Sequence, residues 1–246
     1  MGAMTRRPFS YAQRGNILFL ILLAIILFVA LSYAITSQRD GGKSISSEKA
    51  NSLAATTMQY LTLASNSVQR MVLNGVRVGQ LDFQAPSTVA ASLSANTSCT
   101  TLACRVFDLS GGGVTPMPLS GQATDTSLSQ PYTTAGESKF SVFYQGVKDV
   151  GSDLPEILFL YRAVKKDVCQ QINIVSGVQT GADNIPVDAS GSSPADYVAF
   201  AGTMDPLPVL NPNDLGNGDA RIAGKRTFCV DRAGSGYYLY HVLLAQ

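Results

Sequence analysis

Residues 16–34 read NILFLILLAIILFVALSYA, and this stretch decides how the rest of the chain is organised. No polar side chain occurs between Ile17 and Leu31. A bilayer core is crossed by roughly 20 apolar helical residues, and a helix that is apolar on every face needs lipid or similar helices around it. We therefore predict a transmembrane helix over residues 16–36, which carries everything that follows.

The flanks of this stretch predict its orientation. Arg6, Arg7 and Arg14 precede it with no acidic residue, whereas residues 37–42, SQRDGG, follow it. Basic residues next to a membrane helix stay on the cytoplasmic side. We therefore predict a single-pass protein with a cytoplasmic N-terminus and a C-terminal domain in the periplasm or outside the cell.

The composition of the chain limits its partners. The chain has 246 residues, of which only 14% are charged, and it balances 18 basic residues against 17 acidic ones. Because nucleic-acid binding requires clustered basic charge, no nucleic-acid partner is expected. The part that follows the apolar stretch is about the size of one ordinary domain. Its four cysteines fit two disulfides, which persist outside the cytoplasm.

The residues of the N-terminal region allow two outcomes. One is a signal peptide cleaved after Ala34, because small residues stand at Ser32 and Ala34, the positions that signal peptidase inspects. The other is a permanent anchor, because the apolar run exceeds the roughly 7–15 residues of an ordinary signal peptide. The start of the chain, Met1 or Met4, also stays open.

The residues at the start of the apolar stretch resemble a prepilin junction. Residues 14–20, RGNILFL, are similar to the basic leader end and the abrupt helix start of type IV pilins and type II secretion pseudopilins. The resemblance implies cleavage between Gly15 and Asn16 and a place in the bacterial inner membrane. It also implies other pilin-like subunits as partners, contacted through the N-terminal helix, and a head that carries a β-sheet.

One residue departs from the pattern of that family. Leu20 occupies the fifth position after the cleavage point, where most pilins carry a glutamate that neutralises the terminal amine of a neighbouring subunit. The absence of this glutamate resembles certain minor, tip-type pseudopilins. We therefore expect a pilin-like or minor pseudopilin-like structural subunit of an envelope filament or a secretion apparatus.

Residues 44–73 carry the periodicity of an amphipathic helix. Gly41-Gly42 should bend or end the preceding helix, because each glycine costs about 1 kcal/mol against alanine inside a helix. Asn74-Gly75 should end the second helix. Apolar residues recur at steps of three and four, which predicts one stripe that packs on a sheet: Ala50, Leu53, Ala54, Met58, Leu61, Ala64, Val68, Met71 and Val72. The opposite face is polar: Glu48, Asn51, Gln59, Asn66 and Arg70.

Segments with alternating or β-branched residues predict an antiparallel sheet of about four strands in two hairpins. The strands are expected over residues 140–145, 156–164, 226–231 and 237–244, and a short helix over 165–175. A further strand is expected over 105–109, a flexible turn at 111–113, a polar surface loop over 115–136 and an irregular region over 176–224.

These elements together predict an α+β fold, with an amphipathic helix laid on one face of the sheet. The expected parts are a basic leader (1–15), the transmembrane helix (16–36), a hinge with the amphipathic helix (37–79) and an extracytoplasmic head (80–246).

The four cysteines allow three pairings. Cys99 and Cys104 bracket four residues without a nearby histidine, so a local disulfide is favoured over a metal site. We expect the second disulfide between Cys169 and Cys229, where closing a long loop would contribute about 3–4 kcal/mol in the loop-entropy model. A bridge near the C-terminus also resembles the stapled tail loop of pilins.

Candidate catalytic and metal-binding residues are sparse. His241 is the single histidine and lies within the last expected strand, so no enzyme activity, cofactor or small-molecule substrate is expected. Residues 211–219, NPNDLGNGD, alternate oxygen-bearing side chains with glycines, and a turn-rich surface loop is their simplest interpretation. A calcium loop is the alternative, with four candidate ligands: Asn213, Asp214, Asn217 and Asp219.

Two other functions stay open. A solitary membrane-anchored domain that binds a partner through its loops has the same layout and needs no processing. An exported enzyme would need a set of catalytic side chains, which the sequence does not show.

Overall fold

The structure, a computed structural model of the chain, describes these residues: 16–37, 41–86, 95–128, 133–134, 137–152, 154–179, 181, 184–187, 198–202, 214–232 and 235–246. The chain forms two compact units, Met1–Ser46 and Ser47–Gln246. The larger unit holds the sheet and both disulfides.

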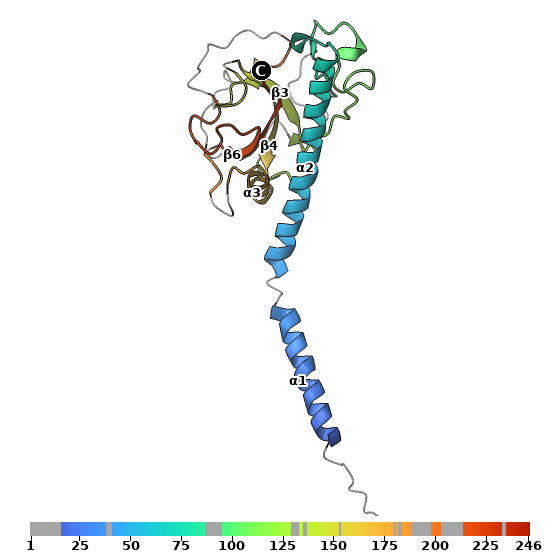
Figure 1. Cartoon of the computed structure of the whole chain (residues 1–246), viewed down its shortest axis with the longest axis vertical. Coiled ribbons are helices and arrows are strands. Elements are labelled where there is room, and N and C mark those ends of the chain that lie inside the picture. The colour runs from blue at the N-terminus through green and yellow to red at the C-terminus, as the bar shows by residue number, and fades with distance from the viewer. Residues whose placement is uncertain are drawn as a thin grey trace, which may run out of the picture. The chain divides into compact units, whose positions relative to one another are not determined.

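Helix α1 spans Asn16–Ser37, which matches the predicted helix over residues 16–36 to within a residue (Figure 1). Its side chains are described over residues 19–32, and all of them are exposed. The least exposed of the large apolar ones, Leu23, is still 44% exposed. Over the described part of the chain, no helix meets the combined length and apolarity that a membrane span requires.

Helix α2 spans Gly41–Leu73. The two glycines that were expected to bend or end the first helix are instead the first residues of α2. The predicted end is confirmed. Gly75 adopts φ 95°, and Val76 N–H donates to the Met71 carbonyl, which is the hydrogen bond of a glycine-ended helix.

The apolar stripe of α2 is buried as predicted. Ala50, Leu61 and Val68 are each at most 1% exposed, whereas every residue of the predicted polar face is exposed. The stripe packs against Phe140, Phe159 and other residues of one sheet face, along which α2 lies in Figure 1. Its many alanines let the helix approach the sheet closely.

The sheet has the strand order β5-β3-β4-β7-β6, and all its pairs are antiparallel. Its long strands form the two predicted hairpins, joined by the β4–β7 pair, and β5 adds a short edge. Their bounds are β3 Phe140–Gln145, β4 Glu156–Val164, β5 Val198–Ala199, β6 Thr227–Asp231 and β7 Tyr237–Leu244. The remaining elements are α3 Lys166–Val175, the 3-10 turns η1 Val78–Gln80 and η2 Leu102–Cys104, and the small ladder of β1 Thr133–Thr134 with β2 Glu137–Ser138.

Helix α3 contacts the outer edge of β6 through the side chain of Asn173. The Asn173 amide donates to the Cys229 carbonyl and accepts from the Cys229 N–H, both at 2.8 Å. Asn173 is fully buried, and so is the disulfide that joins α3 to β6 beside it. These contacts fix α3 to the sheet.

Two predictions, the strand over 105–109 and the polar surface loop over 115–136, are wrong. Residues 105–109 form no strand, because Arg105 makes only an isolated bridge to Asp82 and its carbonyl accepts from Gly112 N–H, which turns the chain back. The segment 115–136 is also more than a polar surface loop. Leu119 and Ala123 lie in the core at 3% and 0% exposure, next to the α2 face of the sheet.

The second face of the sheet is also covered. Its cluster includes Phe143, Leu158, Phe228 and Tyr240 from the strands. Leu215 and Ile222 from the segment 214–224 complete it, and both are 0% exposed. The irregular region that the sequence predicts therefore contributes part of the core, which explains why β4 is buried on both sides.

Candidate functional site

The predicted processing positions lie at the start and near the end of α1. Gly15 lies outside the described residues, whereas Asn16 is the first residue of α1. Ala34 lies inside the helix, which continues to Ser37. A cut between Gly15 and Asn16 would thus release the intact helix, and a cut after Ala34 would divide it.

Both predicted disulfides are confirmed. Cys169 on α3 is bonded to Cys229 on β6, and both residues are 0% exposed. Cys99 is bonded to Cys104, with Cα atoms 5.6 Å apart, and Cys99 is partly exposed. The Cys169–Cys229 bridge is therefore buried in the core, and the Cys99–Cys104 bridge lies near the surface.

The described candidate calcium ligands lie in different environments in the structure. Asn213 lies outside the described residues, and Asn217 is exposed. The Asp219 carboxylate accepts from the Arg221 guanidinium at 2.6 Å, and this hydrogen bond lowers the pKa of Asp219. Burial raises the pKa of Asp214. Within the described residues, no three acidic, histidine or cysteine side chains gather as a metal site requires.

His241 lies within β7, between Phe159 on β4 and Thr227 on β6. Its Nδ1 lies 2.7 Å from the Thr227 hydroxyl, and its Nε2 is buried with no hydrogen-bond partner among the described residues. Burial, followed by the positive charge of Arg226, lowers the pKa of His241 to about 4. The side chain is only 7% exposed, so the structure places it in the sheet, as the sequence predicts.

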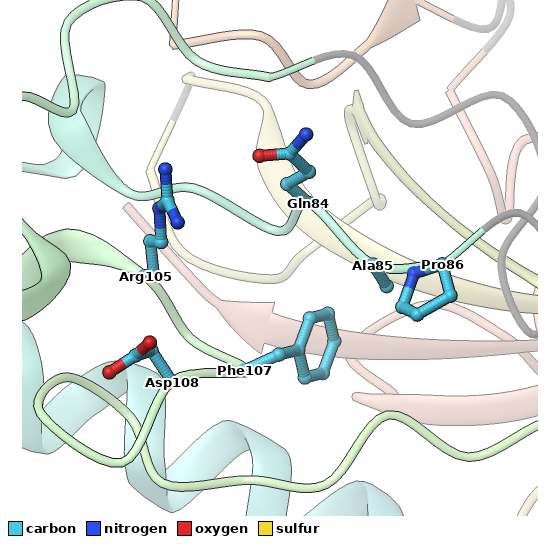
Figure 2. A pocket seen from close by; sticks show the side chains of 6 residues that line it. All are labelled: Gln84, Ala85, Pro86, Arg105, Phe107 and Asp108. Carbon is cyan, nitrogen blue, oxygen red and sulfur yellow. The ribbon is translucent and has the colours of Figure 1, made fainter.

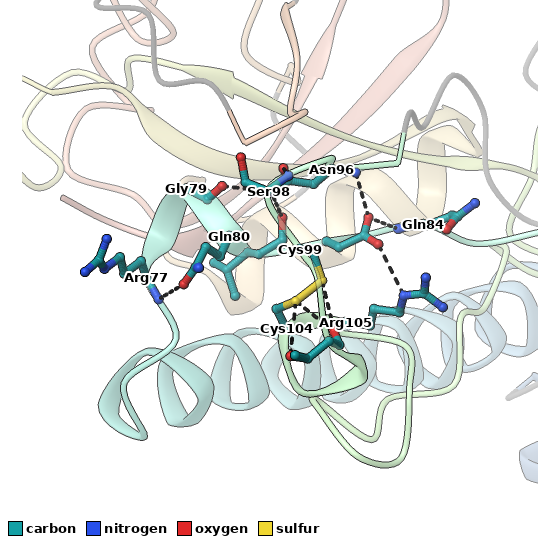
Figure 3. Close-up of a disulfide and its surroundings, with 12 residues drawn as sticks. Arg77, Gly79, Gln80, Gln84, Asn96, Ser98, Cys99, Cys104 and Arg105 are labelled. Carbon is teal, nitrogen blue, oxygen red and sulfur yellow. Dashed lines mark hydrogen bonds and ion pairs between the residues drawn. A yellow bond between two sulfur atoms is a disulfide. The ribbon is translucent and has the colours of Figure 1, made fainter.

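A surface that the sequence did not predict is built around Asp82. The Asp82 carboxylate is 2% exposed and accepts from the N–H groups of Gln84 and Asn96, at 3.0 and 3.2 Å. Its other oxygen lies 3.6 Å from Nε of Arg105. The Asn96 amide in turn donates to the carbonyls of Gly79 and Leu81. Figure 3 shows this network beside the Cys99–Cys104 disulfide. The network links residues 79–84 to Asn96 and Arg105.

A shallow pocket of about 330 Å³ opens next to this network. It is lined by Gln84, Ala85, Pro86, Arg105, Phe107 and Asp108. In Figure 2 the Phe107 ring faces Pro86, and Arg105 and Asp108 lie at the other end. The pocket therefore offers an apolar wall and two opposite charges, at the low end of the roughly 300–1,000 Å³ of small-ligand pockets.

Two exposed leucines flank this pocket in sequence. Leu102 is 49% exposed and lies inside the Cys99–Cys104 loop, and Leu109, beyond Arg105, is 93% exposed. The only sequence signals for this surface were the C-x4-C spacing and the three glycines at 111–113.

A second group that the sequence did not predict lies where the β3–β4 hairpin meets the segment 214–224. Glu156, the first residue of β4, is 1% exposed, and its Oε2 accepts from Val147 N–H at 2.8 Å. Within the described parts of the chain, its Oε1 is buried and has no hydrogen-bond partner. Burial above all, with a smaller contribution from the charge of Asp214, raises the pKa of Glu156 to about 8.

Comparison with known proteins finds no matching family model, no matching curated protein and no matching solved structure.

Proposed function

We propose that this chain is a pilin-like or minor pseudopilin-like structural subunit of a bacterial envelope filament or secretion apparatus. Helix α1 anchors it in the inner membrane with the N-terminus in the cytoplasm, and the head lies in the periplasm or outside the cell. The observation that carries the proposal is α1 itself. Its side chains over residues 19–32 are apolar almost throughout and exposed on every face, so they need lipid or similar helices around them.

The start of α1 supports the same proposal. Asn16, the first described residue of α1, follows the Gly15 that the prepilin-like junction marks for cleavage. The arginines at 6, 7 and 14 keep the leader on the cytoplasmic side. Leu20 lacks the acid of a major subunit, which favours a minor or tip position.

The head supports an extracytoplasmic location. Its two disulfides need an oxidising compartment. A long amphipathic helix packed on an antiparallel sheet is also the layout expected of a pilin head, although many exported α+β domains share it.

The test is the intact mass of the protein recovered from the membranes of a bacterium that has a prepilin peptidase. The proposal expects the chain to start at Asn16. A Gly15→Leu variant serves as the control and should keep its leader. If the wild-type protein keeps its leader, or starts at Ile35, the proposal is wrong.

A solitary membrane-anchored domain is the second candidate. The exposed Leu102 and Leu109, which flank pocket residues in the sequence, favour it, since they offer apolar contacts for a partner. An uncleaved leader, together with crosslinks that form at Leu109 but not along α1, would support this candidate instead.

A further inference from the structure

The pocket beside the Asp82 network lies between two segments that are hydrogen-bonded to each other. Asp82 N–H donates to the Cys104 carbonyl and Val106 N–H donates to the Asp82 carbonyl, both at 2.9 Å. These bonds form the parallel bridge between residues 82 and 105. The pocket opens just beyond the bridge, and its lining residues lie within 84–86 and 105–108. The backbone of the fold therefore sets its two walls side by side.

One end of the pocket carries two opposite charges. Nε of Arg105 lies 3.6 Å from the buried Asp82 carboxylate, and the Arg105 side chain is 44% exposed. A guanidinium has five N–H donors in a planar fork, so one that is paired through Nε can still bind a carboxylate with its two terminal nitrogens. Asp108 accepts from Ser110 N–H at 2.8 Å through Oδ1, and a carboxylate has a second oxygen that can accept from a cation. In Figure 2 the side chains of Arg105 and Asp108 lie at the same end of the pocket.

The other end of the pocket is apolar. There the Phe107 ring faces Pro86, with Ala85 beside it (Figure 2). The Phe107 ring also packs against the rings of Phe83 and Phe140, with centroids 6.3 and 5.4 Å away. Because Phe83 and Phe140 belong to the buried core, the core supports this apolar wall from behind.

This arrangement selects for a ligand that carries both charges. A ligand with only a carboxylate would be repelled by Asp108, and one with only an amine would be repelled by Arg105. A zwitterion that bears its two charges on neighbouring atoms and an apolar group beyond them matches both ends. The volume of about 330 Å³ suits a ligand of this size, since it lies at the low end of the range for small-molecule sites.

We propose that the pocket binds a free α-amino acid with an apolar side chain, such as leucine. The carboxylate of the ligand pairs with Arg105 and its ammonium group pairs with Asp108, while its side chain lies against Phe107. The site goes beyond the role of a structural subunit and needs neither cleavage of the leader nor assembly.

The test is isothermal titration calorimetry of the full chain in detergent micelles. We expect saturable binding of L-leucine. Isocaproate, which is leucine without the ammonium group, and isoamylamine, which is leucine without the carboxylate, should each bind roughly 10- to 100-fold more weakly, because each leaves one charge of the pocket unpaired. Glycine, which cannot cover the apolar wall, should bind roughly tenfold more weakly or less still.

A single variant tests the charge that selects the ammonium group. Asp108→Asn keeps an oxygen for Ser110 N–H, so it should bind leucine roughly 10- to 100-fold more weakly, whereas isocaproate should lose no affinity. Asp167→Asn is the matched control, because Asp167 also accepts a backbone N–H, from Val168 at 2.9 Å, but lies on α3 and does not line the pocket. It should bind leucine as the wild type does.

Four results would overturn the proposal. The first is no saturable binding of leucine or phenylalanine up to roughly 10 mM. The second is equal affinity of the wild type for leucine and for its two single-charge analogues, a comparison that does not require any variant to fold. The third is unchanged leucine binding by Asp108→Asn. The fourth is tighter binding of the dipeptide leucyl-leucine than of leucine, which would make the occupant a peptide. None of these results bears on the start of the mature chain, so the pilin-like assignment stands or falls separately.

Discussion

The Cys169–Cys229 disulfide should stabilise the head far more than the Cys99–Cys104 disulfide. The two bridges span sequence separations of 60 and 5 residues. In the loop-entropy model these separations correspond to about 4 and about 2 kcal/mol. Burial acts in the same direction, because Cys169 and Cys229 are 0% exposed and fix α3 to β6.

The assay is urea unfolding of the full chain in detergent micelles, followed by circular dichroism. With a slope of about 2 kcal/mol per molar urea, replacing Cys169 and Cys229 by alanine should lower the midpoint by about 2 M, and the same change at Cys99 and Cys104 by about 1 M. Mild reductant should also open the Cys99–Cys104 bridge first, because Cys99 is partly exposed. An equal or larger loss from the Cys99–Cys104 pair would refute the reasoning.

Three further predictions concern single side chains. Replacing Asn173 by alanine should cost about 1–3 kcal/mol in urea unfolding, because it leaves the buried N–H and carbonyl of Cys229 without partners; an unchanged midpoint would contradict this. On α2, Leu61→Ala should cost about 2–5 kcal/mol, whereas Gln59→Ala, on the exposed face, should stay within about 0.5 kcal/mol; similar losses at both would mean that α2 does not pack through its stripe. The lowered pKa of His241 means that its contribution to stability is present above the unfolded pKa of about 6.5 and is lost as the pH falls toward about 4. Urea midpoints between pH 7 and 4 should therefore fall less steeply in a His241→Leu variant, and equal slopes would contradict the prediction.

The sequence predicts the regular elements of the head closely. The apolar stripe of α2 and the apolar and aromatic residues of β4 and β7 are local features of the sequence. The predicted bounds of these elements therefore agree with the observed bounds to within a few residues. The same logic fails for residues 105–109, whose β-branched and aromatic composition is that of a strand. Within the described residues their backbone pairs with residue 82 only at an isolated bridge, and Gly112 takes the Arg105 carbonyl.

The candidate sites were harder to predict because they depend on contacts between distant segments. The Asp82 network joins residues 79–84 to 96 and 105, and Asp214 lies against Gly146. No local pattern marks either Asp82 or Glu156. The sequence analysis offered Asp214 only as a candidate ligand of an alternative calcium loop, whereas its position in the fold depends on Gly146, which has no side chain to keep the carboxylate away.

The Asn173 side chain has a consequence for how another chain could join the sheet. By bonding both backbone groups of Cys229, it takes the place of a neighbouring strand at the edge of β6. Asp231 N–H on the same edge donates to the Pro186 carbonyl. At these described positions β6 does not offer the free backbone that strand addition needs. A chain that added a strand at these positions of β6 would have to displace Asn173 and Pro186.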